Sequence, residues 1–383
     1  MRVLLIGEFS RLHNSLKEGL LALGHDVVLV ANGDGFKNYP ADFSTKAKWS
    51  ESKFLKFPRK AIHKITGFDI AVLEFGLRFY FHLNKLKNFD VVQLINEAPI
   101  QTIPVFERYL LKKIATTNHK IFLLCCGVDY VVANYMVQKK PRYSIMNPYF
   151  ENPENKKEYG YIFDFLTPDH KKSHEYVYTT IEGVIASDMD YVFPLLDNPK
   201  YLGLIPNPVN TDKIIYSENE VSDTITIFLG INRGTYHTKG IVFFEKALAL
   251  IKEKYATKVE IIIAESLPYV DYIKLYNKAN IVLDQVYAFD QGYNALEAMA
   301  KGKVVFTGAE KEFEDHYNLS EKVAINAMPD IAYLVSELSY LIENPNKIKS
   351  IGNRARKFIE KEHDYIMIAG KYIEKWNSVK CES

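Results

Sequence analysis

Two cations and a carboxylate in the second half of the chain have the types and spacing to bind a phosphorylated ligand. Arg233 and Lys239 lie in one glycine-containing loop, and Glu297 lies in a segment expected to be helical just after Gly292. Free backbone amides at a helix start attract phosphate. Two cations beside them would stabilise the negative charge that develops on a leaving nucleoside diphosphate. The alternative is a solvated loop whose exposed cations contribute little.

The residues around Glu297 predict a β-loop-α-β unit. Short apolar runs at 281–283 and 304–306 are expected to be buried strands, and residues 293–301 between them a helix. Apolar residues spaced by three and four from Leu296 mark the buried face of that helix. Glu297 is therefore expected at the edge of a ligand crevice, where a carboxylate needs a hydroxyl or a cation to bind.

The stretch from Gly292 to Gly302, Gly-x-x-x-x-Glu-Ala-Met-Ala-x-Gly, resembles the donor-binding signature of GT-B glycosyltransferases. The resemblance is to the retaining bacterial enzymes of family 4, also called group 1. It implies that Glu297 holds the ribose hydroxyls of a nucleotide sugar. It also implies that Gly292, Tyr293 and Asn294 lie beside the donor.

The same resemblance extends to the pyrophosphate and the donor sugar. The family carries an arginine and a lysine that reach the donor pyrophosphate, and Arg233 and Lys239 match them with a separation one residue longer than usual. A second glutamate of the family pattern would stand at Phe289, so Asp290, one residue later, is the candidate substitute.

Two aromatic rings near this loop are further donor-side candidates. Tyr269 could stack on the base of the nucleotide, or be a packed surface aromatic. His237 could contact the donor, or be an exposed histidine. The sequence leaves both alternatives open, together with the identity of the base.

The first half of the chain predicts a doubly wound parallel sheet. A strand at 2–6, a helix at 15–23 whose start carries the capping-box pattern Ser15-x-x-Glu18, and a strand at 27–30 form a parallel unit. The loop after the first strand lacks G-x-G-x-x-G, which argues against a dinucleotide-binding dehydrogenase. Polar residues expected to line the acceptor side of the crevice are Asn14, Asn96 and Asp129.

The surroundings of Asp129 support two interpretations. Gly127 and Asp129 match the His-Gly-x-Asp pattern of the related enzymes, while Cys126 stands at the place of their histidine. Asp129 could line an acceptor pocket, or serve only as a turn or helix cap. A cysteine in an apolar strand is far more often a core residue than a nucleophile.

The length of 383 residues exceeds the usual size of one hydrophobic core. We therefore expect an α/β protein of GT-B fold, with two Rossmann-like doubly wound parallel-sheet domains facing a central cleft. Residues 1–208 would form the acceptor-side domain and residues 209–355 the nucleotide-sugar donor domain. Residues 356–383 would form a helix that crosses back to the first domain. Two prolines near residue 208 stiffen the connection.

The composition excludes several other classes. A net charge of +1 gives no general attraction to nucleic acid. The three cysteines lack metal-ligand spacing, and no run of about 18 apolar residues is present. A cytoplasmic protein is expected, with no metal and no cofactor beyond a nucleotide diphosphate sugar as co-substrate.

Two segments have no clear sheet or core pattern. Residues 46–64 interleave basic and aromatic residues, which suits either peripheral contact with the inner face of the cell membrane or a solvated connection. Residues 147–174 are rich in Pro, Asn, Lys and Tyr and are predicted to be a long irregular insertion.

The function that the resemblance implies is transfer of a sugar from a nucleotide sugar to a hydroxyl of a glycan or lipid-linked acceptor, with retention and without a metal. The expected setting is synthesis of a surface polysaccharide or glycolipid. Two alternatives stay open. One is a GT-B nucleotide-sugar epimerase, which would need further acid and base carboxylates in the crevice. The other is a non-catalytic GT-B binding subunit, which Phe289 and Cys126 motivate.

Overall fold

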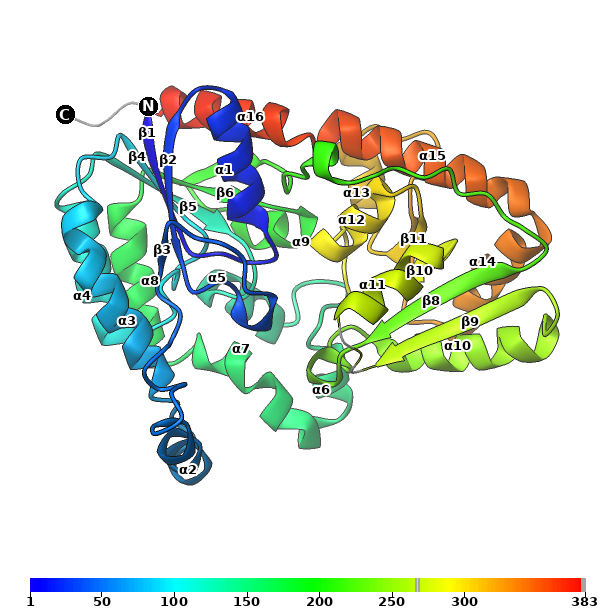
Figure 1. Cartoon of the computed structure of the whole chain (residues 1–383), viewed down its shortest axis with the longest axis horizontal. Coiled ribbons are helices and arrows are strands. Elements are labelled where there is room, and N and C mark those ends of the chain that lie inside the picture. The colour runs from blue at the N-terminus through cyan, green and yellow to red at the C-terminus, as the bar shows by residue number, and fades with distance from the viewer. Residues whose placement is uncertain (266, 268, 380–383) are drawn as a thin grey trace.

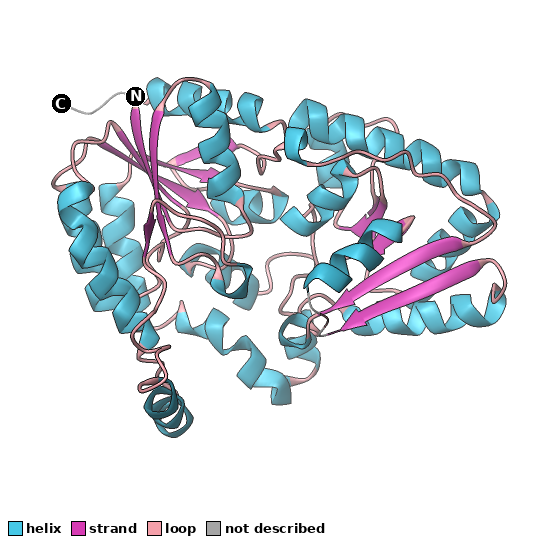
Figure 2. Cartoon of the chain, viewed as in Figure 1, coloured by secondary structure: helices cyan, strands magenta, loops and turns pink. Residues whose placement is uncertain are grey.

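The computed structural model describes residues 1–265, 267 and 269–379, which fold into two α/β domains lying side by side (Figure 1). Each domain is built on a parallel sheet, of seven strands in the first and five in the second. Helices cover the sheets, as Figure 2 shows. This arrangement confirms the fold class that the sequence predicted.

The first sheet has the strand order β3-β2-β1-β4-β5-β6-β7, and all of its pairings are parallel. Its central strands are buried along almost their whole length because helices cover both faces. The strands are β1 (Arg2–Ile6), β2 (Asp26–Ala31), β3 (Phe43–Ser44), β4 (Val91–Leu94), β5 (Lys120–Cys125), β6 (Gly183–Ala186) and β7 (Tyr201–Leu204).

The helices of the first domain connect these strands and include one that stands away from the domain. They are α1 (Leu12–Ala22), α2 (Lys56–Thr66), α3 (Ala71–His82), α4 (Pro104–Ala115), α5 (Tyr130–Val137), α6 (Asn147–Glu151), α7 (Gly160–Asp164), α8 (Pro168–Thr180) and α9 (Met189–Val192). Figure 1 shows α2 projecting below α3, at the lower end of this domain.

The second sheet has the strand order β12-β11-β10-β8-β9 and is also parallel. Its strands are β8 (Ile225–Ile231), β9 (Val259–Glu265), β10 (Ile281–Leu283), β11 (Val304–Thr307) and β12 (Ile325–Asn326). Its helices are α10 (Ile241–Lys254), α11 (Tyr269–Lys278), α12 (Tyr293–Ala300), α13 (Lys311–His316), α14 (Ile331–Glu343) and α15 (Pro345–Glu362).

The last helix, α16 (Tyr365–Ser378), returns to the first domain and packs along α1 (Figure 1). The two helices approach closely at Gly19, where a Cβ atom would lie 2.1 Å from the carbonyl oxygen of Tyr365. Trp376 is fully buried in the first domain, and its Nε1 donates a hydrogen bond to Oε1 of Gln93 at 3.0 Å. The end of the chain is therefore part of the first core.

Two local predictions are wrong. Helix α1 begins at Leu12 rather than at residue 15, because Ser15 is buried inside the helix and its hydroxyl bonds to Tyr293 instead of capping. Residues 147–174 are mostly helical rather than irregular. Their prolines occupy the first turns of helices, where proline's missing N–H costs nothing.

None of the helices in the described part of the chain has the length and apolar character needed to cross a membrane.

Candidate active site in the interdomain cleft

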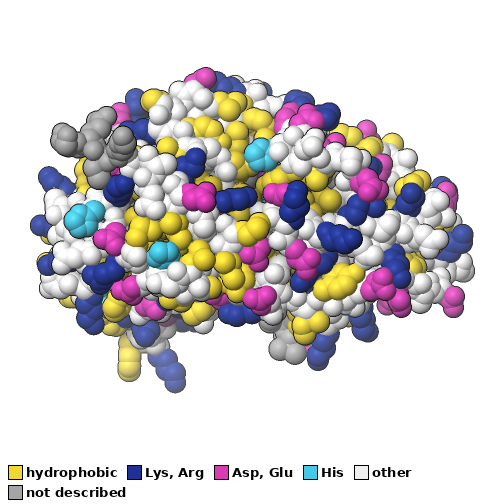
Figure 3. All heavy atoms as spheres, turned by 90° about the horizontal axis from the view of Figure 1, so that it is seen from above, with side chains coloured by type: hydrophobic (Ala, Val, Ile, Leu, Met, Phe, Trp, Pro, Cys, Tyr) yellow, Lys and Arg dark blue, Asp and Glu magenta, His cyan; other side chains and the backbone are white. Residues whose placement is uncertain are grey.

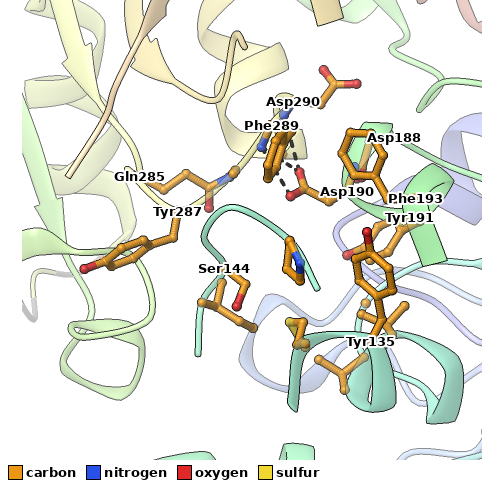
Figure 4. A pocket seen from close by; sticks show the side chains of 18 residues that line it. Tyr135, Ser144, Asp188, Asp190, Tyr191, Phe193, Gln285, Tyr287, Phe289 and Asp290 are labelled. Atoms are coloured by element: carbon orange, nitrogen blue, oxygen red, sulfur yellow. Dashed lines mark hydrogen bonds between the residues drawn. The ribbon is translucent and has the colours of Figure 1, made fainter. Parts of the chain in front are cut away.

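A cavity of about 220 Å³ lies between the two domains (Figure 4). The first domain contributes α5, the loop before α6 and the α9 segment, and the second contributes the loop 285–292 between β10 and α12. Aromatic rings form much of the wall, and the polar groups are few, as is typical of a ligand pocket. Its labelled lining residues are Tyr135, Ser144, Asp188, Asp190, Tyr191, Phe193, Gln285, Tyr287, Phe289 and Asp290.

Lys239 lies beside this cavity, at the carboxyl end of the second sheet. Its Nζ is 2.7 Å from Oδ1 of Asp284, which is buried at the end of β10. The same Oδ1 accepts a hydrogen bond from Asn294 at 3.3 Å, so the cation, the carboxylate and the first turn of α12 form one group. The residue that follows Asp284, Gln285, lines the cavity.

Arg233 occupies the same edge of the sheet but has a different partner. Its guanidinium makes two hydrogen bonds of 2.6 Å to the carboxylate of Glu265, at the end of β9, and it lies over the ring of Tyr236. The pair is exposed, so the guanidinium is available to a ligand. Nε2 of His237, in the same loop, is 3.7 Å from the carboxylate of Glu158 in the first domain.

Glu297 lies in α12 one helical turn after Tyr293 and Asn294, and so on the same face of the helix as these residues. Within the described chain its carboxylate makes no hydrogen bond. Burial raises its pKa, while the charges of Lys301, Arg11 and Lys37 act in the opposite direction. A half-buried carboxylate without a bonded partner has free acceptor positions for hydroxyl groups.

The start of α12 is joined directly to the first domain. Gly292 precedes the helix in an extended conformation and lines the cavity. The hydroxyl of Tyr293 is 2.7 Å from Oγ of Ser15 in α1. The helix start that is predicted to bind the donor therefore lies at the cleft, where it lines the cavity and contacts the first domain.

Phe289, at the place of the family's first glutamate, fills the interface with aromatic contacts. Its ring stacks on Tyr143 at a centroid distance of 5.0 Å and meets Phe193 edge to face at 5.0 Å. Arg142 lies over the same ring at 4.9 Å and forms ion pairs with Glu310 and Glu312. The hydroxyl of Tyr143 also donates to Glu310.

Asp290 is buried and accepts hydrogen bonds from the backbone amides of Gln291 at 2.7 Å and Met189 at 3.2 Å. Burial raises its pKa to about 6. Sequence reasoning missed its counterpart, Asp190, whose carboxylate accepts from the amides of Phe289 and Asp290 (Figure 4). Each aspartate thus caps backbone of the opposite domain. Asp190 shortly follows strand β6, a position at the crevice edge that could have identified it.

The three predicted acceptor-side residues are buried, Asn14 in the first turn of α1, Asn96 in the loop after β4 and Asp129 just before α5. Asp129 caps α5 through the amide of Val132 at 2.8 Å, and burial raises its pKa to about 7. Oδ1 of Asn96 accepts from the amide of Ala98. Asn14 bonds to Glu8, as described below. None of the three is among the residues that line the cavity.

Tyr269 begins helix α11, but its side chain lies outside the part of the chain that the structure describes. Its proposed stacking on a base stays a prediction.

Glu8 is a further buried carboxylate at the crevice edge. Only Gly7 separates it from the end of β1. Its Oε2 accepts hydrogen bonds from Nδ2 of Asn14 at 2.6 Å and from the amide of Asn14 at 2.8 Å. Its other oxygen has no partner in the described structure. Burial raises the pKa of Glu8 from 4.5 to about 7, although the bonds from Asn14 lower it.

This raised pKa predicts a pH-dependent effect of Glu8→Gln. The folded state holds the proton more tightly than the unfolded state, so stability is lost as the pH rises from 4.5 to about 7. We expect the variant to be more stable than the parent at about pH 8, by up to about 3 kcal/mol, and equally stable near pH 4. Urea unfolding at both pH values measures this difference, and equal stability at the higher pH would contradict it.

Comparison with known proteins gives one family match. Residues 242–374 match a protein-family model described as glycosyl transferase-like. The match runs from α10 into α16 and includes Glu297 and the α12 helix. A comparison with curated protein sequences gives no match.

Solved structures align with nearly the whole chain. The sucrose-phosphate synthase of Thermosynechococcus elongatus aligns with a TM-score of 0.60 and 14% identity over 100% of both chains. HepE of Anabaena, solved with UDP and glucose, aligns with a TM-score of 0.57 and 11% identity over 99% of this chain and 100% of its own. The UDP-GlcNAc 2-epimerase of Neisseria meningitidis aligns with a TM-score of 0.53 and 12% identity over 99% and 100%.

These alignments confirm the GT-B fold that the sequence predicted. The family match over residues 242–374 agrees with the predicted glycosyltransferase class. The narrower placement in family 4 stays a prediction.

Proposed function

We propose that this GT-B protein transfers a sugar from a nucleoside diphosphate sugar to an acceptor hydroxyl in the cleft between its domains. The observation that carries the proposal is the group formed by Lys239, Asp284 and Asn294 beside a 220 Å³ cavity. It brings a cation and a helix start to the mouth of a pocket that both domains line. That combination suits a pyrophosphate whose sugar enters the pocket.

In this proposal each donor-side residue has a separate role. Lys239 and Arg233 bind the pyrophosphate and stabilise the charge of the leaving nucleoside diphosphate. Glu297 accepts hydrogen bonds from the ribose hydroxyls with a carboxylate that has no bonded partner in the described chain. Arg233 exchanges its pairing with Glu265 for the ligand, which costs little because the pair is exposed.

The acceptor side is proposed to be the first-domain wall of the cavity. Asp129 holds α5, one element of this wall, by capping it, while Asn96 and Asn14 lie outside the cavity lining. All three are proposed to help position the acceptor on this side. Domain closure around the cavity would exclude water and so limit hydrolysis of the donor. Asp290 supports the closed arrangement through its bond to the amide of Met189.

The finer features of the proposal rest on the resemblance to the retaining enzymes. These features are retention of configuration, independence of a metal, and a role in surface polysaccharide or glycolipid synthesis. A glycan or lipid-linked acceptor fits that role. A cytoplasmic location, with peripheral contact to the inner face of the cell membrane, is part of the same proposal.

An epimerase is the second candidate, because buried carboxylates gather at the cleft and an epimerase shares the fold. An epimerase needs acid and base groups that reach the sugar. Asp190 and Asp290, however, are engaged by backbone amides of the opposite domain. This use of the carboxylates favours the transferase.

The donor site is tested by thermal denaturation with UDP-, GDP-, ADP- and dTDP-sugars. HepE was solved with UDP and glucose, so UDP-sugars are the first probes. A selective donor stabilises the native state by about 2.7 kcal/mol at a concentration of 100 times Kd. We expect Glu297→Ala and Arg233→Ala to abolish the shift without lowering the melting temperature of the free protein.

Lys246→Ala is the matched control, because this exposed lysine lies on α10 outside the proposed site. If both site variants respond to the donor as the parent does, the assignment of the donor site is wrong. Release of nucleoside diphosphate that depends on an acceptor identifies a transferase. An epimer formed from the nucleotide sugar alone identifies the epimerase, and binding without either product identifies a binding subunit.

A further inference from the structure

Among the helices whose side chains the structure describes, α2 is the most exposed. None of its residues is buried, and it projects from the first domain rather than packing on a sheet (Figure 1). Its attachment runs through Arg59, whose guanidinium makes two hydrogen bonds of 2.6 Å to Asp69 and also pairs with Glu51. An isolated helix of 11 residues is only marginally stable in water. We therefore expect its apolar residues to pack against a partner surface.

The first ten residues of α2 separate into two opposite faces. At 100° per residue, the apolar positions fall on one side of the helix and the basic positions on the other. The apolar residues are Phe57, Pro58, Ala61, Ile62 and Ile65. The basic or histidine residues are Lys56, Arg59, Lys60, His63 and Lys64.

The apolar face is exposed to solvent. Phe57 is 80% exposed and Ile65 is 84% exposed, and Phe54, just before the helix, is 90% exposed. An apolar strip of this kind on a stable protein marks an interaction site.

A second group of exposed aromatic side chains lies on the body of the first domain. The ring of Trp49 contacts Phe81 of α3, Phe81 contacts Tyr80, and Tyr80 stacks on Tyr109 of α4. All four side chains are exposed. Helices α3 and α4 therefore present exposed aromatic surface of their own in addition to α2.

The charge of this segment is of one sign. Between Glu51 and Asp69 the chain has no acidic residue, and Lys53 adds to the cations of α2. Elsewhere the surface is mixed: on the face over α15 and α16, Lys and Arg side chains alternate with Asp and Glu (Figure 3). A basic face opposite an aromatic and aliphatic face is the pattern of helices that lie in a bilayer interface.

We propose that α2 and the adjoining aromatic side chains form a docking surface for a bilayer of anionic phospholipid. Phe54, Phe57, Ile62 and Ile65 enter the acyl boundary, and the lysines contact the lipid headgroups. Arg59 stays with Asp69 and fixes the helix to the first domain. The inference rests on the peripheral membrane contact of the proposed function and assigns it to α2. Its failure is distinguishable from failure of the sugar transfer, since vesicle binding needs neither donor nor acceptor.

The test is flotation of the full chain with phosphatidylcholine vesicles, with and without phosphatidylglycerol. The parent should bind the anionic vesicles and not the neutral ones. Changing Lys56, Lys60 and Lys64 together to Glu should weaken binding at least about 100-fold. Changing Phe57 and Ile65 together to Ser should weaken it at least about tenfold. Because these residues are exposed, the melting temperature should stay within about a degree of the parent's.

Two matched variants serve as controls. Lys252, Lys347 and Lys357, exposed on the second domain, are changed to Glu to give the same charge difference. Leu196 and Ile215, which are 63% and 88% exposed, are changed to Ser to remove apolar surface elsewhere. Both controls should bind vesicles as the parent does.

Three outcomes would overturn the proposal. The parent could fail to bind anionic vesicles, or both α2 variants could bind as well as their controls. Alternatively, gel filtration without lipid could show a dimer that Phe57→Ser with Ile65→Ser converts to a monomer, in which case a second copy covers this face.

Discussion

The combined change Lys239→Met with Asp284→Asn is expected to lower the rate of sugar transfer by about 10²- to 10³-fold while the protein remains folded. Lys239 is linked to the start of α12 through the carboxylate of Asp284, which it shares with Asn294. Its loss removes a charge that stabilises the leaving nucleoside diphosphate more strongly as the bond breaks than it stabilises the bound donor. The effect should therefore fall mainly on kcat.

The double change is needed because Lys239 also neutralises a buried group. The side chain of Asp284 is 2% exposed, and removal of the lysine alone would leave its charge uncompensated. Breaking a buried ion pair from one side costs about 3 to 5 kcal/mol. The single variant Lys239→Met should therefore lose both stability and activity, and it cannot separate the two roles.

Release of nucleoside diphosphate is measured with the donor that the thermal-shift screen selects, together with the melting temperature of each variant. Asp284→Asn alone, which keeps the lysine, is the matched control and should retain most of the activity. A double variant with the parent's kcat would show that Lys239 does not act on the pyrophosphate.

The largest effect on stability is expected from Trp376→Ala, at about 3 to 5 kcal/mol. Trp376 is fully buried, contacts the rings of Phe122 and Tyr372, and bonds to Gln93. Its truncation leaves a cavity and an unpaired buried oxygen on Gln93. Because α16 is the segment that carries this residue, the helix should detach from α1 at a lower temperature than the rest of the first domain unfolds.

Trp49→Ala is the matched control, since Trp49 is half exposed and should change stability by less than about 1 kcal/mol. Urea unfolding followed by circular dichroism compares the variants, because each of them removes one of the two tryptophans of the chain. Two domains need not unfold together, so the first transition is the relevant one. Equal losses for the two variants would show that α16 contributes little to the first core.

The unit around Glu297 shows what local sequence determines. Strands β10 and β11 and helix α12 occur where apolar spacing and Gly292 predicted them. The reason is that strand and helix periodicity depends on residues a few positions apart. Lys239 and Asn294 meet at the sheet edge for a related reason, because carboxyl ends of parallel strands share one edge.

The same rule could have found more of the site. Asp284 directly follows β10 and Glu8 closely follows β1, so both stand where polar residues emerge at the crevice. By contrast, no local pattern indicates that Asp190 caps the amides of Phe289 and Asp290, about a hundred residues away in the chain. The helices within 147–174 were also missed, because prolines there mark helix starts rather than irregular chain.

The sequence by itself determined the β-α-β units around residues 2–30 and 281–306, the two parallel-sheet domains, and the residue types available for a phosphate and a ribose. Tertiary structure alone decided which groups meet across the cleft: Ser15 with Tyr293, Phe289 with Tyr143, and Glu297 facing the charges of Arg11 and Lys37. The physical reason is that such contacts depend on how two separately folded sheets are placed, and no periodicity within one element records that placement.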